Sequence, residues 1–183
     1  MNIVRAALLL IVLQYLSLDA WAQDTSQSNL EHHIKAVFLY KFPTYIEWPL
    51  SAFEKDDDPF TIGIMGAEEI AKELLKISEK KRVNDRPVQV KHIDPEDTFD
   101  NLHILFIGRQ ESERLQSLLS SLQSKPILTV TESSGALEAG SVINFLLINR
   151  NIRFEISTTS ADSKGVRISS RLLDIAHRVE SGK

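Results

Sequence analysis

The sequence FTIGIMG at residues 60–66, followed by EEIAKELLKISEKK at residues 68–81, joins a short β-like run to a helical run. The second run repeats Ile70, Leu74 and Ile77 on one helical face. Its glutamates stand at the positive end of the helix dipole and its last lysines at the negative end. Strand followed by helix is typical of an α/β sheet, and this stretch therefore predicts the fold class.

The same alternation continues to the end of the chain. We expect further strands at Pro87–Ile93, His103–Gly108, Ile127–Thr131, Val142–Ile148 and Ile152–Ser157, and helices at Glu111–Gln123 and near Ser169–Val179. The Asn149-Arg150-Asn151 turn joins the last two strands. The sequence therefore predicts a single α/β domain with a mostly parallel sheet, a C-terminal antiparallel hairpin and helices on both faces.

Upstream of residue 60, Asn29 can cap a helix that is apolar around most of its circumference and runs to Phe42. Pro43 should kink or end this helix, because it has no N–H to donate and its ring crowds the preceding turn. Such a helix needs burial on more than one side. We expect Phe42, Tyr45 and Trp48 to contribute to a protein interface, with plain core packing as the alternative.

The first 22 residues have the features of a secretory signal peptide. Arg5 precedes an apolar run, and Ala20-Trp21-Ala22 provides a cleavage site. The run is too short for a stable transmembrane anchor, although an uncleaved amphipathic anchor is the alternative. We expect cleavage after Ala22 and export to the periplasm. Residues 23–28 would then form a flexible leader and residues 29–183 the folded domain.

Composition excludes several functions. The chain of 183 residues has 21 Lys and Arg against 25 Asp and Glu, a net charge of -4, so no basic field is available to bind nucleic acid. Cysteine is absent, which excludes thiolate nucleophiles, disulfides and zinc sites built on sulfur. Stability must come from packing alone.

No motif predicts catalysis, a cofactor or a metal. The Gly63-Ile64-Met65-Gly66 turn could hold an anion, but it lacks a third glycine and a following Lys-Ser or Lys-Thr, and a tight strand-to-helix turn explains it better. A hydrolase using Glu132 and Glu155 lacks a nucleophile and an oxyanion donor at usable spacing. The five histidines, His32, His33, His92, His103 and His177, lack metal-ligand spacing and are expected to be surface residues or satisfied by hydrogen bonds. We therefore expect no enzyme activity.

Several short motifs together resemble the YfiR family of exported bacterial proteins. The opening KAVFLYKF at residues 35–42 and YIEWP at residues 45–49 carry the resemblance first. Phe60–Gly66, Arg86-Pro87-Val88, LTVT at 128–131, INF at 143–145, RFEI at 153–156 and ISSRLLDIA at 168–176 then follow in the family's order. The resemblance covers nearly all of the chain after the signal sequence.

This resemblance implies a periplasmic, non-enzymatic α/β regulator, often dimeric, without a cofactor. It would bind the periplasmic part of an inner-membrane signalling protein and repress a diguanylate cyclase. The chain departs from the family at Pro43, at Ala139-Gly140-Ser141 where a glycine pair is common, and at Ser157 where Asn is usual. A disulfide-based redox switch, present in some members, is excluded here because there is no cysteine.

The alternative is a small-ligand-binding accessory protein of a sensor or outer-membrane receptor system. In that case the carboxyl ends of the strands would surround a pocket near Gly66 and Gly108.

Overall fold

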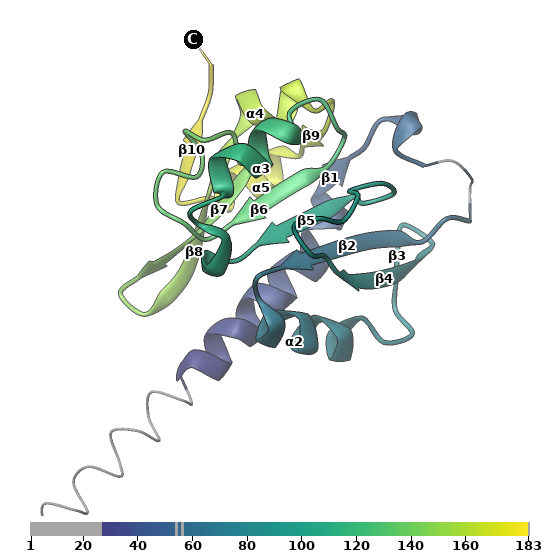
Figure 1. Ribbon diagram of the computed structural model, residues 1–183, viewed down its shortest axis with the longest axis horizontal. Coiled ribbons are helices and arrows are strands. Elements are labelled where there is room, and N and C mark those ends of the chain that lie inside the picture. Colours follow the sequence, from purple (N-terminus) through teal and green to yellow (C-terminus); the bar gives the residue numbers. More distant parts are fainter. Residues whose placement is uncertain (1–26, 54, 56, 183) are drawn as a thin grey trace, which may run out of the picture.

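The computed structural model describes residues 27–53, 55 and 57–182. Among them, an eight-stranded sheet has the order β10-β8-β7-β6-β5-β2-β4-β3 (Figure 1). Its strands are β2 (Phe60–Met65), β3 (Arg82–Val83), β4 (Arg86–His92), β5 (Ile104–Ile107), β6 (Leu128–Thr131), β7 (Ile143–Ile148), β8 (Asn151–Ser157) and β10 (Arg178–Glu180). The strands expected from the sequence are thus all present, within a few residues of their expected bounds.

Strand directions confirm the expected mixed sheet. β4, β2, β5, β6 and β7 lie parallel to one another, and β7 and β8 form the expected antiparallel hairpin. Ile148 pairs with Asn151, so the loop contains only Asn149 and Arg150. Both have positive φ, 50° and 62°, which matches the right-handed twist of a two-residue hairpin.

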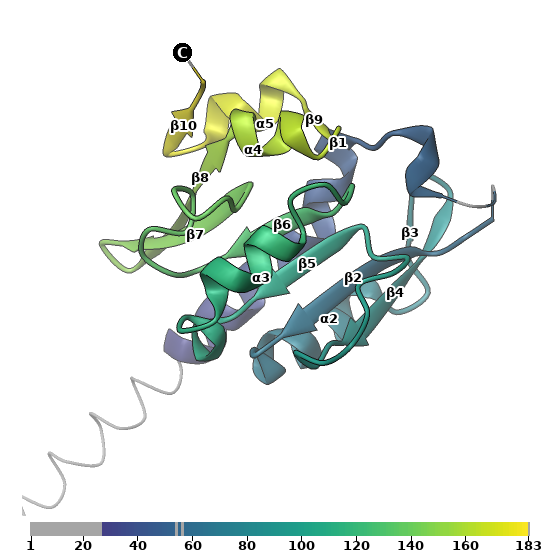
Figure 2. The same ribbon diagram turned by 45° about the horizontal axis from the view of Figure 1, so that its top comes forward.

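Helices cover both faces of the sheet, as predicted. The described helices are residues 27–41, α2 (Glu68–Ser78), α3 (Leu115–Ser121), α4 (Thr158–Ser163) and α5 (Ser170–Ile175), with 3₁₀ turns η1 (Phe42–Tyr45), η2 (Leu50–Ala52) and η3 (Arg109–Glu111). The N-terminal helix (27–41) and α2 share one core with Ile62, Phe106 and Phe145, whereas α3 packs in a second core with Met65 and Leu105. Figure 2 shows α3 and the N-terminal helix on opposite sides of the sheet.

The chain changes direction across the sheet between β2 and β5. After β2, it crosses by α2 to β4 on one side, and then returns to β5 on the other side. α2 and α3 therefore lie on opposite faces, and a crevice is expected beyond the carboxyl ends of β2 and β5, where the connections to the two helices leave the sheet in opposite directions. The same topology brings Gly66 and Gly108 together. A Cβ on Gly108 would lie 2.2 Å from the carbonyl oxygen of Gly66, so only glycine fits there.

Pro43 ends the N-terminal helix, as predicted. The α-helical hydrogen bonding stops at residue 41, and Pro43 enters the first turn of η1. The chain then extends as β1 (Ile46–Glu47), which pairs antiparallel with β9 (Arg167–Ile168) in a separate two-stranded sheet. Among the described residues, no helix is both long and apolar enough to cross a membrane.

The prediction of one helix over Ser169–Val179 is wrong. α5 ends at Ile175, Ala176 is extended, and β10 runs parallel to β8 from Arg178. The N–H of His177 donates to the carbonyl of Phe154 at 2.8 Å, which starts this pairing. Edge pairing and the ion pair between Arg178 and the buried Glu155 therefore outweigh helical propensity here.

Other differences concern the ends of helices and short elements. α2 stops at Ser78, because Glu79 leaves the helix and Lys80 has a φ of 56°. The helix expected at Glu111–Gln123 is α-helical only over α3 and is preceded by η3. Asn29 lies within the helix rather than at its cap, and Gln27 and Ser28 are helical too. The expected signal peptide and its cleavage site lie outside the described residues.

Candidate functional site

The segment between the N-terminal helix and β2 carries the residues expected to bind a protein. Phe42 is only 1% exposed and belongs to the core that the N-terminal helix and α2 share with the sheet. It therefore presents no surface to a partner in this conformation. Tyr45 and Trp48 are partly exposed and pack against the edge of the same core. The structure thus separates Phe42 from the two aromatic residues that a partner can reach.

Trp48 lines a surface hollow of about 260 Å³ together with Ile46, Glu47, Phe53, Phe60, Asn84 and Arg86. The indole ring meets Phe60 edge-on at a centroid distance of 5.0 Å. The indole N–H is buried and has no acceptor among the described residues. A buried donor without an acceptor is unfavourable, so this N–H is an unsatisfied polar group within the core beneath Trp48.

Leu50 lies next to this hollow in the sequence and is 96% exposed, the most exposed large apolar residue among those described. It stands in η2, which has no buried residue, after Pro49 at its N-cap. The segment that follows β1, coloured blue in Figure 1, projects from the body of the molecule. We call Tyr45, Trp48, Leu50 and Phe53 the aromatic surface.

His103 packs against Phe53, one of the residues of the aromatic surface. Its ring stacks on Phe53 at 4.2 Å and is buried. Nδ1 accepts the N–H of Thr61 at 3.1 Å, and Nε2 donates to the carbonyl of Ala52 at 3.1 Å, with the tautomer fixed by the backbone donor. Burial lowers the pKa of His103 to about 4, so the ring is neutral at physiological pH.

Arg86 also contacts Phe53 and the residues that follow it in the chain. Its guanidinium lies 3.9 Å from the centroid of the Phe53 ring, in a cation–π contact. Its Nη1 donates to the carbonyls of Lys55 and Asp58 at 3.0 and 2.9 Å. His103 and Arg86 together hold the Phe53 ring in place before any partner binds.

The crevice at the carboxyl ends of β2 and β5 contains a second cavity, of about 350 Å³, beside Gly66 and Arg109. This is the place where a small-ligand pocket was expected. Gly66 has a positive φ of 63° in a tight strand-to-helix turn, and Gly108 lies directly against it. These backbone requirements explain why both residues are glycine, without any ligand. On α2, Glu69 pairs with Lys72 at 2.8 Å.

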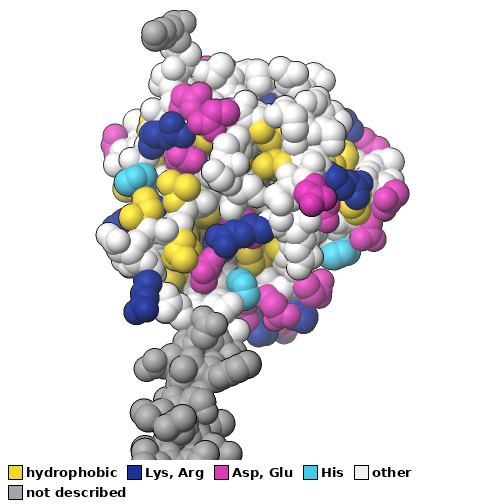
Figure 3. All heavy atoms as spheres, turned by 60° about the vertical axis from the view of Figure 1, so that its left-hand side comes forward, with side chains coloured by type: hydrophobic (Ala, Val, Ile, Leu, Met, Phe, Trp, Pro, Cys, Tyr) yellow, Lys and Arg dark blue, Asp and Glu magenta, His cyan; other side chains and the backbone are white. Residues whose placement is uncertain are grey.

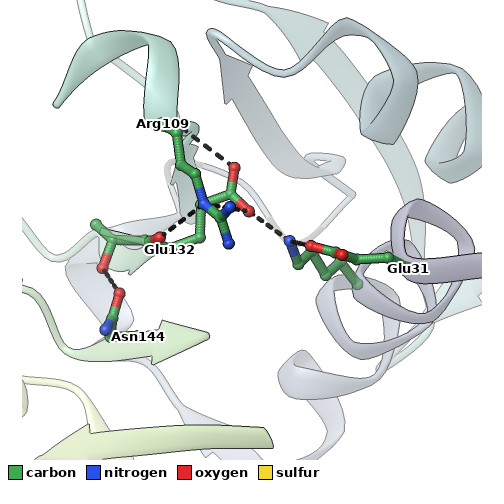
Figure 4. A network of polar contacts seen from close by, with 6 residues as sticks. Glu31, Arg109, Glu132 and Asn144 are labelled. Carbon is green, nitrogen blue, oxygen red and sulfur yellow. Dashed lines mark hydrogen bonds and ion pairs between the residues drawn. The ribbon is translucent and has the colours of Figure 1, made fainter. Parts of the chain in front are cut away.

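An ion-pair network borders this cavity (Figure 4). The ammonium of Lys35, buried in the N-terminal helix, binds the carboxylates of Glu31 and, at 2.5 Å, Glu132. Glu132 also accepts the backbone N–H of Arg109 at 3.2 Å. The network ties the N-terminal helix to the ends of β5 and β6, and every buried charge in it is paired.

Glu132 and Glu155, the carboxylates of the hydrolase hypothesis, are held in separate structural contacts. Glu155 accepts the Asn144 amide at 3.0 Å and pairs with Arg178 at 2.8 Å. No group of three or more His, Asp or Glu side chains in the described part of the chain could hold a metal ion. On the face drawn in Figure 3, Lys and Arg side chains are scattered among Asp and Glu side chains.

Sequence reasoning missed Leu50, Arg86 and His103 as parts of this site. Leu50 had one available signal, an apolar residue directly after the Trp48-Pro49 pair. Arg86 begins β4 and His103 directly precedes β5, far along the chain, and only the sheet order places them beside Phe53. A scan against protein-family models matches residues 32–177 to the family described as YfiR/HmsC-like.

Proposed function

Because the chain belongs to the YfiR/HmsC-like family, we propose that it is a non-enzymatic periplasmic regulator whose partner is an inner-membrane signalling protein. The family is known for periplasmic regulators of c-di-GMP signalling. In this proposal the protein binds the periplasmic part of a diguanylate cyclase and represses it.

The aromatic surface is the observation that supports protein binding most strongly. It combines a leucine that is 96% exposed with aromatic rings that are partly exposed. Interfaces gain most of their binding energy from a few aromatic and apolar anchors in preformed hollows. A partner would cover Leu50 and fill the hollow of about 260 Å³.

Replacing Leu50 by aspartate should weaken partner binding at least about tenfold, because a carboxylate would be desolvated in the interface. The free protein should lose less than about 0.5 kcal/mol of stability, since Leu50 makes no core contact. The measurement is the Kd for the purified periplasmic part of a membrane-bound diguanylate cyclase from the same bacterium.

Leu75→Asp is the matched control, because Leu75 is 54% exposed on α2, remote from the aromatic surface in sequence and on another element. It should bind the partner as tightly as the wild type. Equal Kd values for wild type and Leu50→Asp would show that the partner does not bind through the aromatic surface.

Periplasmic localisation is part of the same proposal and rests on Arg5, the apolar run after it and Ala20-Trp21-Ala22. Mass spectrometry of the periplasmic fraction should find Gln23 at the N-terminus. Recovery of the chain in the membrane pellet with Met1 retained would contradict export with cleavage.

A further inference from the structure

Lys164 is a buried cation at the end of α4, far from the aromatic surface in the sequence. The residue has a relative exposure of 4%, and it follows Ser163 as the C-cap of the helix. The ammonium donates to the carbonyl of Leu122 at 2.7 Å, at the end of α3. No carboxylate of the described residues forms an ion pair with it, so no negatively charged side chain compensates its charge.

The other buried charges differ in this respect. Lys35 binds two carboxylates, and Glu155 binds Arg178. A buried charge is unfavourable unless a counter-charge and hydrogen bonds compensate it. Burial lowers the pKa of Lys164 to about 8, and a pKa of this size leaves the ammonium as the main form at neutral pH. The ammonium has three N–H donors, and Leu122 accepts only one.

Lys164 lines a cavity of about 320 Å³ between α3 and α4. Its walls are rich in hydroxyl and amide groups, from Gln116, Ser120, Gln123, Thr159, Ser160 and Ser163. Glu138 is the other charged residue of the lining, but its side chain is 61% exposed and pairs with Arg178 at 3.5 Å. The volume suits a small molecule, at the lower end of the range for ligand pockets.

We propose that this cavity binds a small anion that carries hydroxyl groups, with the Lys164 ammonium as the counter-charge for its carboxylate or phosphate. The unused N–H donors of Lys164 would bind the anionic oxygens. The serine, threonine and glutamine side chains would bind the hydroxyl groups of the ligand. Binding would supply the counter-charge that the protein itself lacks at this position.

Thermal unfolding of the mature protein with three matched probes tests this site at constant ionic strength. Glycerate and glycerol 3-phosphate carry the two anionic groups, and glycerol carries neither. At a concentration of about 100 times its Kd, at least one anion should raise Tm by roughly 5 °C or more, and glycerol should not. The more effective anion distinguishes a carboxylate from a phosphate ligand.

Lys164→Met should abolish the increase in Tm while leaving the protein folded, because the change removes an uncompensated buried charge. Lys76→Met, on the exposed side of α2, is the control and should keep the wild-type response. In the wild-type protein, the anion should also slow acetylation of Lys164 by acetic anhydride, measured by mass spectrometry. This measurement needs no variant and so remains decisive if Lys164→Met does not fold.

The absence of a response to both anions would overturn the proposal. A response that persists in Lys164→Met, or one equally large with glycerol, would also overturn it. Partner binding through the aromatic surface is unaffected by any of these outcomes, because it depends on different residues.

Discussion

Phe42→Ala is expected to lower the free energy of unfolding by about 3 to 5 kcal/mol, because it removes a fully buried aromatic ring. The ring lies in the centre of an aromatic cluster, at 5.8 Å from Phe38, 5.9 Å from Phe145 and 5.5 Å from Phe154. Its removal would leave a cavity where the N-terminal helix meets β7 and β8. Denaturant unfolding followed by circular dichroism measures the change.

Leu50→Ala is the control for this measurement and should change the free energy of unfolding by less than about 0.5 kcal/mol. Comparison of the two variants distinguishes a residue that stabilises the fold from a residue that faces solvent. A loss below about 1 kcal/mol for Phe42→Ala would mean that the N-terminal helix is not packed against β7 and β8 through this ring.

The second large effect is a loss of stability in weak acid caused by His103. The pKa of this ring is lowered from 6.5 to about 4, chiefly by burial, so the unfolded chain binds a proton at higher pH than the folded protein does. The contribution of neutral His103 to the free energy of unfolding should therefore be fully present above pH 6.5 and should be lost as the pH falls toward 4. The difference between the two pKa values corresponds to a loss of about 3 kcal/mol in the free energy of unfolding.

The window between pH 4.5 and 6.5 separates this effect from those of Glu69 and Glu73. Hydrogen bonds from Lys72 and Lys76 lower the pKa of Glu69 and Glu73 from 4.5, so their stabilising contribution is lost only below that pH. His103→Gln can still accept from Thr61 and donate to Ala52 but cannot titrate. Its stability should be nearly constant in this window. A wild-type curve that is equally flat would contradict a buried, neutral His103.

Protonation of His103 should also act on the proposed binding surface. The charged ring can no longer accept the Thr61 N–H, while Phe53 stacks on one of its faces. We expect the segment around Phe53 to loosen as the pH falls toward 4. The amide protection factors at residues 50–53, which are corrected for the intrinsic pH dependence of exchange, should then be lower than at pH 7.

The sheet could be predicted from the sequence because its long strands are apolar runs, as in β2 and β7, or alternate apolar and polar residues, as in β8, and turns delimit them. Pro43 and the Asn149-Arg150 turn were equally predictable, since their backbone preferences are local. The C-terminal prediction was wrong because Leu172, Leu173, Ala176 and Val179 fit helical spacing, while β10 is set by its non-local pairing with β8. β1 and β9 are two residues each and depend entirely on one another.

The site was less predictable than the fold. Phe42 and Trp48 belong to the same sequence motif, yet one is in the core and the other reaches the surface, because η1 turns the chain between them. The uncompensated charge of Lys164 has no sequence signal. It follows only from the packing of α4 against the end of α3.

The concentration of c-di-GMP in the source bacterium tests the proposed regulation most directly. It should be measured in the parent, in a strain without this gene, and in that strain carrying wild-type or Leu50→Asp protein at equal periplasmic abundance. We expect loss of the gene to raise c-di-GMP, wild-type protein to restore the parental level, and Leu50→Asp to leave it raised. An unchanged c-di-GMP concentration after loss of the gene would contradict repression of a diguanylate cyclase.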